Sequence, residues 1–449
     1  MSDLTIQWIL VIASSLVLFF VSPYAKTVND FFKGSKLEKE PGFILLTSSL
    51  VISWLFAKSI TNSANLGLSF GIVGGVAYAG YYLSFLVAGI TIYFMRVKGK
   101  FNSIHEFLSH QFGRSAIFVF SLLISFRLLN EVWSNTMVIG SYFGEQGTSG
   151  YFLSIVVFTG LTLAYTLKGG LRSSLLTDMI QMVLFIILLF VILALILPKE
   201  GMSVSRFLST GEWTAAGGIN LIFVAFLQIF SYPFHDPVMT DRAFIAPPKL
   251  TLKSFMVASL IGSTSIILFS FIGIYGSFIG VEGQAAVGVS QMMGITMMIM
   301  INFIMITSAA STLDSAFNSF SKMMVIDLKI FKDVTISKGR LVIIVGCLIG
   351  TFPIFFNPSI LSATTVSGTM VIGLTPVFLF WYLKAPKISF HLSIFSGIAV
   401  GILLMMEYDF PFLHFEGPYH ILLEANIVGF ISCITLYLIP VAFTKWKKR

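Results

Sequence analysis

A row of hydroxyl groups interrupts a stretch that is otherwise typical of a membrane span, ITSAASTLDSAF at residues 306–317. The spacing i, i+3, i+4 and i+7 places four of them on one face of an α-helix. These four are Ser308, Ser311, Thr312 and Ser315. Hydroxyls alone would equally serve to bond the backbone or join helices. Asp314 lies on the shoulder of that face, and hydroxyl plus carboxylate oxygens favour a site for a small, hard cation.

A second carboxylate follows a sharp turn in GGLRSSLLTDMIQ, residues 169–181. The paired glycines and Arg172 predict a tight turn. Asp178 lies about two helical turns beyond it, beside Gln181. A carboxylate at that depth in a membrane needs a cation, a proton or a hydrogen-bond donor.

Two other stretches carry signals for interrupted helices. SWLFAKSITNSANLGLSFGIVGG, residues 53–75, has serine, threonine, asparagine and glycine where a plain membrane helix has leucine and valine. In SYPFHDPVMTDRAFIAPP, residues 231–248, two prolines bracket His235 and Asp236, and proline breaks the hydrogen-bond ladder of a helix. Segments of this kind can unwind and offer backbone carbonyls to an ion.

The composition is that of a membrane protein. Of the 449 residues 56% are hydrophobic and 11% are charged, and the mean hydropathy is +0.92. Soluble domains do not have this balance. Both cysteines, Cys347 and Cys433, lie in apolar runs, which argues against a disulfide framework. The first residues lack a basic segment and a cleavage site, so we expect a retained helix rather than a signal peptide.

Thirteen stretches are long enough to cross a bilayer as helices. We expect one all-α integral membrane domain, 1–449, with spans at 5–23, 41–65, 70–97, 116–143, 149–167, 171–198, 218–245, 252–280, 289–328, 338–353, 358–384, 388–406 and 420–443. The two halves, 41–198 and 218–384, hold five spans each. Because five is odd, the halves cross in opposite directions, which is the inverted-repeat pattern with a site between two interrupted helices.

Lysine and arginine indicate the orientation. With the N-terminus outside, 24 of the 28 basic residues fall in cytoplasmic stretches, 242–253 among them, two fall outside and two lie within spans. The positive-inside rule therefore predicts a multi-pass protein of the cell membrane with a cytoplasmic C-terminus. Topology explains the net charge of +8 without a nucleic-acid partner, and the lipid bilayer is the expected surrounding.

Six ionisable residues remain inside the predicted spans: Lys58, Arg127, Glu131, Asp178, Asp236 and Asp314. Such residues are costly in a bilayer and usually face a cavity or a partner. Each one alone could belong to a satisfied structural pair. Six together indicate a polar interior, which a transport pathway supplies.

These motifs resemble the sodium:solute symporter family. GGLRSSLLTDMIQ is similar to that family's signature of paired glycines followed by Thr-Asp and Gln, and SAASTLDSAFNSFSKMMVIDL and TDRAFIA are similar to two further family elements. The resemblance covers nearly the whole chain. It implies a LeuT-type fold of five plus five inverted helices, with one extra N-terminal helix, 5–23, and two extra C-terminal helices within 388–443. The first interrupted helix most resembles the urea-transporting branch.

The resemblance also implies ligands for one or two Na+ ions. The first site would use two carbonyls and three hydroxyls, those of Ala57, Ile60, Ser308, Ser311 and Thr312. A second cation or proton site would use Asp178, Asp314 and Ser315, together with Ser311. Relatives often have serine where this chain has Asp314, so the second site is more acidic here.

The candidate substrate-binding residues are Ser59, Asn62, Arg127, Glu131, His235 and Asp236. In the resemblance, Asp236 falls on an acidic position of the urea branch, and Arg127 on a position where acid-transporting relatives place an arginine. Glu131, four residues further on, could instead neutralise Arg127 as an internal pair.

Lys58 departs from the family pattern, in which relatives usually have a small or neutral residue. As a modulator of the ion site, its ammonium could replace sodium electrostatically. It could instead pair with Asp178, Asp314 or Asp236.

We therefore expect a secondary active transporter that couples sodium flow to uptake of a small polar solute by alternating access. An amino acid, a urea-like amide or a carboxylate would fit. The alternative is a proton-coupled symporter or a uniporter with Lys58 in place of the sodium ion. The sequence has no H-E-x-x-H motif, nucleophile elbow or repeated filter motif, which argues against an enzyme or a channel. We expect a monomer.

Overall fold

The computed structural model describes residues 3–34, 40–199, 203–356 and 368–446, and this part of the chain is helical throughout, with short connections. Nine of its helical segments are long and apolar enough to cross a membrane, and two shorter apolar helices accompany them. The all-α membrane architecture thus agrees with the sequence. The count of thirteen spans stays a prediction, since the start of the span 358–384 lies outside the described residues.

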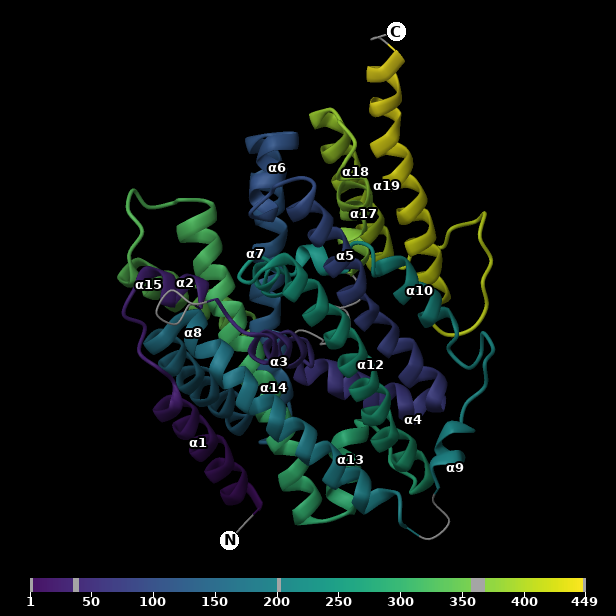
Figure 1. Cartoon of the computed structure of the whole chain (residues 1–449). Helices are drawn as coiled ribbons and strands as arrows, with labels where there is room; N and C mark the ends of the chain where they lie inside the picture. The colour runs from purple at the N-terminus through teal and green to yellow at the C-terminus, as the bar shows by residue number, and fades with distance from the viewer. Residues whose placement is uncertain (1–2, 35–39, 200–202, 357–367, 447–449) are drawn as a thin grey trace.

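The helices follow one another with the chain ends at opposite poles of the molecule (Figure 1). They are α1 Asp3–Val21, α2 Val28–Lys33, α3 Phe43–Trp54, α4 Ala57–Ala79, α5 Ser84–Val97, α6 Ile104–Phe112, α7 Arg114–Gly140, α8 Ser149–Ile196, α9 Val204–Leu208, α10 Asn220–Gln228, α11 Pro237–Arg242, α12 Pro248–Phe278, α13 Ala285–Met292, α14 Ile295–Lys322, α15 Ile336–Thr351, α17 Leu374–Leu379, α18 Lys387–Met405 and α19 His420–Trp446.

The predicted glycine turn lies inside α8. Gly170 has φ 58° and ψ −144°, a conformation that residues with a side chain rarely adopt. A Cβ there would lie 2.5 Å from the carbonyl oxygen of Phe31 in α2. The turn separates two membrane-length halves of α8, and Asp178 lies on the second half. Arg172 also holds α2, because its guanidinium lies 3.5 Å from the Asp30 carboxylate.

The first interrupted helix breaks between α3 and α4. Leu55 and Phe56 leave the helical conformation, with ψ values of 61° and 145°. The sequence predicts unwinding somewhere within residues 53–75. The structure places one break at these two residues and a further kink inside α4 at Gly71, with φ 60° and ψ −144°. Ala57 and the polar residues after it are therefore helical.

The second interrupted helix breaks between α10 and α11. A short 3-10 helix, Tyr232–His235, follows α10, and Asp236 is extended, with φ −101° and ψ 99°. The Asp236 carboxylate accepts a hydrogen bond from the Val238 N–H at 2.9 Å, so it caps α11. Pro237 begins α11, where its missing N–H costs nothing.

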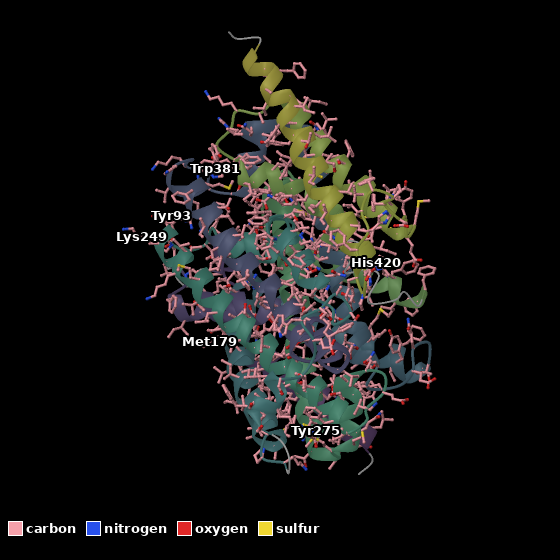
Figure 2. All side chains as sticks on the ribbon, turned by 90° about the vertical axis from the view of Figure 1, so that its right-hand side faces the viewer. Tyr93, Met179, Lys249, Tyr275, Trp381 and His420 are labelled. Atoms are coloured by element: carbon pink, nitrogen blue, oxygen red, sulfur yellow. The ribbon has the colours of Figure 1, made fainter. Side chains whose placement is uncertain are left out.

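α14 is the central helix of the bundle. It packs against α7, α8 and α15, and every residue from 304 to 321 is buried. A helix that is buried all round belongs to the interior. The outer helices instead expose apolar side chains, as Phe118 on α7 does, which suits contact with lipid. Figure 2 shows Lys249 and Tyr275 toward opposite ends of α12, as one membrane crossing requires.

Candidate functional site

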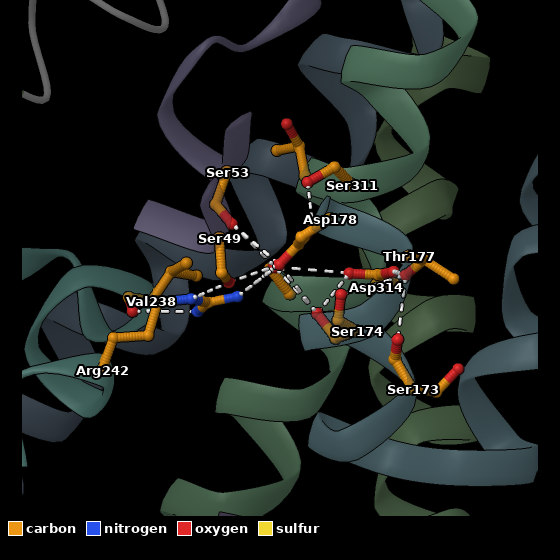
Figure 3. Close-up of polar contacts among 12 residues, drawn as sticks. Ser49, Ser53, Ser173, Ser174, Thr177, Asp178, Val238, Arg242, Ser311 and Asp314 are labelled. Carbon is orange, nitrogen blue, oxygen red and sulfur yellow. Dashed lines mark hydrogen bonds and ion pairs between the residues drawn. The ribbon is translucent and has the colours of Figure 1, made fainter. Parts of the chain in front are cut away.

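Two carboxylates lie together at the contact between α8 and α14, as Figure 3 shows. Asp178 and Asp314 are both fully buried. Ser174 lies between them: its hydroxyl donates to Asp314 Oδ1 at 2.7 Å and lies 3.5 Å from Asp178 Oδ2. Thr177 donates to Asp314 Oδ2 at 3.1 Å. A second cation or proton site built from Asp178 and Asp314 requires the two carboxylates to lie close together, and here they do.

One cation reaches this cluster. Arg242, the last residue of α11, has a fully buried side chain whose Nη2 lies 3.1 Å from Asp178 Oδ2. The same nitrogen donates to Ser315 Oγ at 2.8 Å, and Nε donates to Ser49 Oγ at 2.6 Å. Ser49 in turn donates to Asp178 Oδ2 at 2.5 Å. The positive-inside count includes Arg242 among the cytoplasmic residues, and the structure shows that its side chain is buried in the protein rather than exposed.

The charges of this cluster do not balance. Asp178 has the ion pair with Arg242, but Asp314 has only hydroxyl partners among the described residues. With both carboxylates ionised, two negative charges face one positive charge. A buried charge without compensation is costly, so the cluster needs a further cation or a proton.

The predicted sodium hydroxyls line α14 directly beside this cluster. Ser311 donates to Asp178 Oδ1, and Thr312 donates to the Ser308 carbonyl at 2.9 Å. The Ser308 hydroxyl is buried and has no hydrogen-bond partner in the described part of the chain. Buried polar groups are normally hydrogen-bonded, so this hydroxyl is available to a ligand.

The two predicted carbonyl ligands lie in the first turn of α4, which contacts α14. Ala57 and Ile60 are both fully buried. The Ala57 carbonyl accepts a hydrogen bond from Thr61 Oγ1 at 3.0 Å, in addition to its helical bond from the Thr61 N–H. The structure thus brings the carbonyl and hydroxyl candidates onto adjoining helices.

A second group of buried charges joins the two interrupted helices to α7. The Lys58 ammonium lies 2.7 Å from Glu131 Oε1, and Arg127 contacts the same carboxylate. Arg127 Nη2 also lies 3.5 Å from Asp236 Oδ2, which accepts a hydrogen bond from Trp54 Nε1 at 2.8 Å. Two cations therefore face two carboxylates.

These contacts correct the expected partners of Lys58. Its ion pair is with Glu131, rather than with Asp178, Asp314 or Asp236, and its ammonium also donates to Ser134 at 3.3 Å. Arg127 and Glu131 do form the internal i, i+4 contact that the sequence allows as the structural alternative.

A cavity of about 200 Å³ lies between α4, α10 and the second break. Ser59 and Asn62 line it. The Tyr78 hydroxyl donates to Ser59 Oγ at 3.2 Å and accepts a hydrogen bond from Asn62 Nδ2 at 3.4 Å. Four other candidate residues are buried outside the described lining: Arg127, Glu131, His235 and Asp236. Aromatic rings form much of the wall instead, and sequence reasoning missed them because they are scattered over several helices.

A larger cavity, of about 520 Å³, lies among α6, α11 and the end of α14. Lys322 lines this cavity and forms ion pairs there, with Nζ 2.5 Å from Asp241 Oδ1 and 3.4 Å from Asp327 Oδ2. His105 on the surface helix α6 lies 3.7 Å from Asp327. Burial lowers the pKa of His105, so the imidazole is neutral at pH 7.

Comparison with known proteins gives distant sequence relatives, and no family model matches the chain. Over 278 residues it is 22% identical to the probable urea active transporter 3 of Schizosaccharomyces pombe, with 55% of this chain and 40% of that protein covered. Over 191 residues it is 26% identical to sodium/myo-inositol cotransporter 2 of Mus musculus, with 40% and 28% covered. The matches span less than half the length of these curated relatives.

Solved structures match over nearly the whole chain. A Na+-coupled sialic acid symporter in a substrate-bound, outward-open state has a TM-score of 0.74 at 18% identity, with 98% of both chains covered. Mhp1, a nucleobase-cation-symport-1 family transporter in a closed conformation, has a TM-score of 0.59 at 15% identity, with 95% of this chain and 96% of that chain covered. The chain therefore has the LeuT-type fold of these multi-span membrane transporters.

Proposed function

We propose that this chain is a secondary active transporter in which sodium drives the symport of a small polar solute by alternating access. The observation that carries the proposal is the buried oxygen cluster of α8 and α14, with its excess negative charge and the unpartnered hydroxyl of Ser308. Sodium coupling also stands in the names of the mouse relative and the sialic acid symporter.

The first sodium ion would bind between α4 and α14. Its ligands would be the carbonyls of Ala57 and Ile60 and the hydroxyls of Ser308, Ser311 and Thr312. Oxygen ligands of this kind suit a hard cation. The ion would link the first interrupted helix to α14 and so favour one of the two access states.

Asp178, Asp314 and Ser315 would form the second cation or proton site. Arg242 already supplies one positive charge there. A second sodium ion or a proton on Asp314 would complete the balance.

The smaller cavity would admit the solute from outside, and the larger one would release it to the cytoplasm, as the positive-inside orientation requires. The solute would be an amino acid, a urea-like amide or a carboxylate. The yeast relative is described as a urea transporter.

The alternative, in which Lys58 takes the place of sodium, has less support. Its ammonium is already held by Glu131 and Ser134 on α7. A proton-coupled symporter or a uniporter would have to rely on Asp314 or on Arg242 instead.

Thermal unfolding of the purified chain in detergent tests the proposal, with sodium compared against choline at equal ionic strength. A ligand that binds only the folded state stabilises it by about 2.7 kcal/mol at a concentration about 100 times Kd. Ser308→Ala is the sharpest variant, because removing an unpartnered hydroxyl breaks no hydrogen bond. We expect it to keep the melting temperature in choline and to lose the sodium-dependent rise. Ser311→Ala and Thr312→Ala should also lose the sodium-dependent rise.

Thr307→Ala is the matched control. Thr307 is buried on the same helix, one residue from Ser308, and its hydroxyl bonds the backbone carbonyls of Phe303 and Ile304. The control should retain the full sodium response. A wild-type chain with equal melting temperatures in sodium and choline would contradict sodium coupling.

A further inference from the structure

The wall of the smaller cavity is largely aromatic, and most of its polar groups are uncharged. Trp54, Phe56 and five tyrosines supply rings, and Ser59, Asn62 and Gln228 supply uncharged polar groups. Lys58 is the one charged side chain in the described lining. Its ammonium is directed to Glu131, 2.7 Å away, so it is not available to pair with a solute.

The other charges near this cavity lie behind the rings. Phe56 and Tyr232 line the cavity, and their ring centroids lie 5.4 and 5.5 Å from the Arg127 guanidinium carbon. Trp54 likewise lines the cavity and donates to Asp236. The rings thus stand between the cavity and charges that are already paired.

A charged solute would disturb this arrangement. A carboxylate would have to draw Lys58 or Arg127 away from Glu131, which would leave a buried charge without its partner. An ammonium group would face the same problem with Glu131 and Asp236. An uncharged solute needs neither exchange, because it bonds to hydroxyl and amide groups and its flat or apolar face lies against the rings.

We propose that the solute is uncharged: a small molecule with amide or hydroxyl groups, rather than a carboxylate, an ammonium or an amino-acid zwitterion. This inference rests on the proposed transport function and narrows its solute. The charged cluster of Lys58, Arg127, Glu131 and Asp236 then serves to hold the two interrupted helices to α7 instead of binding the solute's charge.

Matched pairs of probes test the proposal by thermal unfolding of the full chain in sodium. The pairs are nicotinamide and nicotinate, lactamide and lactate, and urea and guanidinium, with alanine as the zwitterion. We expect at least one neutral probe to raise the melting temperature by about 2 °C or more, and its charged counterpart to leave it unchanged. A charged probe that stabilises as strongly, or a panel in which no neutral probe stabilises, overturns the proposal.

The sodium–choline difference without a solute keeps this result separate from the proposed function. A sodium response together with a charged stabilising probe would leave sodium coupling standing and would remove only the neutral solute. Loss of the sodium response itself would count against the coupling.

Asp236→Asn tests the role of the charges directly. Asparagine caps a helix as well as aspartate does, so α11 keeps its start, while the cluster gains one net positive charge. We expect binding of nicotinate or lactate, relative to the amide, to improve roughly tenfold. Asp333→Asn, in an exposed loop, should leave the ratio at its wild-type value. An unchanged ratio in Asp236→Asn as well would show that the paired charges do not select the solute, and would overturn the proposal.

Discussion

Two clusters of buried charge in this molecule differ in their balance. Beside the smaller cavity, two cations, Lys58 and Arg127, face two carboxylates. Between α8 and α14, Asp178 and Asp314 face Arg242, the single cation of this cluster in the described part of the chain. Both clusters bring an interrupted helix against a continuous one, so the difference between them is mainly one of charge.

That difference indicates separate roles. A cluster whose opposite charges are paired keeps its arrangement without a ligand, so the first one suits a scaffold that fixes the breaks in both interrupted helices. A cluster with an excess charge changes its stability when a cation or a proton binds. The response to the coupling ion should therefore arise at Asp178 and Asp314, and the solute should be selected elsewhere.

Arg242→Met should have the largest effect, because it removes the one cation of the unbalanced cluster. Two buried carboxylates would then face no partner, and breaking a buried ion pair in this way costs on the order of 3–5 kcal/mol. The free energy of unfolding, measured by SDS titration in mixed micelles, should fall by that amount. Adding Asp178→Asn to the variant should restore part of the loss, because it removes the carboxylate that Arg242 pairs with.

Lys249→Met is the matched control for that change. Lys249 is exposed at the start of α12, where Figure 2 shows it at the edge of the molecule. It should leave the free energy of unfolding within about 0.5 kcal/mol of wild type. Equal small losses in both variants would mean that Arg242 does not compensate the carboxylates.

The sequence predicted the breaks better than the partners. Both interruptions carry local signals, since proline and small polar residues act on their own backbone. The Arg127–Glu131 contact could also be predicted from the sequence, because it follows the helical i, i+4 spacing. The partners Asp178 and Arg242 are 64 positions apart, and no periodicity links residues on different helices.

Lys58 illustrates the same limit. Its position beside the first break suggests a role at the ion site, but the direction of its side chain depends on how α4 packs against α7. The structure turns it toward Glu131, 73 positions further along the chain. The aromatic wall could not be predicted for the same reason, because its rings come from α3, the first break, α4, the 3-10 turn that follows α4, the second break and the residue before α19.

Glu131→Gln probes the balanced cluster and should have an intermediate effect. It leaves Lys58 and Arg127 with Asp236 as their remaining carboxylate, but the amide oxygen of glutamine still accepts a hydrogen bond. A loss of about 1.5–3 kcal/mol is expected, the contribution of a hydrogen bond to a charged group. The same SDS titration measures it.

A second substitution distinguishes charge balance from packing at this position. Lys58→Met together with Glu131→Gln restores neutrality, since Arg127 then faces Asp236 alone. The two losses should be less than additive by at least about 0.5 kcal/mol, the threshold for coupled neighbours. Full additivity would refute the idea that these charges act as one balanced group.

Asp314→Asn should have the smallest effect on stability and the opposite sign. It removes the excess negative charge while the amide oxygen still accepts the hydrogen bond of Ser174. The Thr177 hydroxyl loses its carboxylate acceptor but keeps the backbone carbonyls of Ser173 and Ser174 as acceptors. In choline we expect a gain of about 1 kcal/mol in the free energy of unfolding, comparable to one net hydrogen bond. The sodium-dependent rise in melting temperature should shrink, because the cluster is already balanced. The exposed Asp333→Asn change should alter neither quantity. If Asp314→Asn instead destabilises the protein in choline and keeps the full sodium response, then Asp314 serves as a structural hydrogen-bond acceptor. The excess negative charge would then not be the cause of sodium binding.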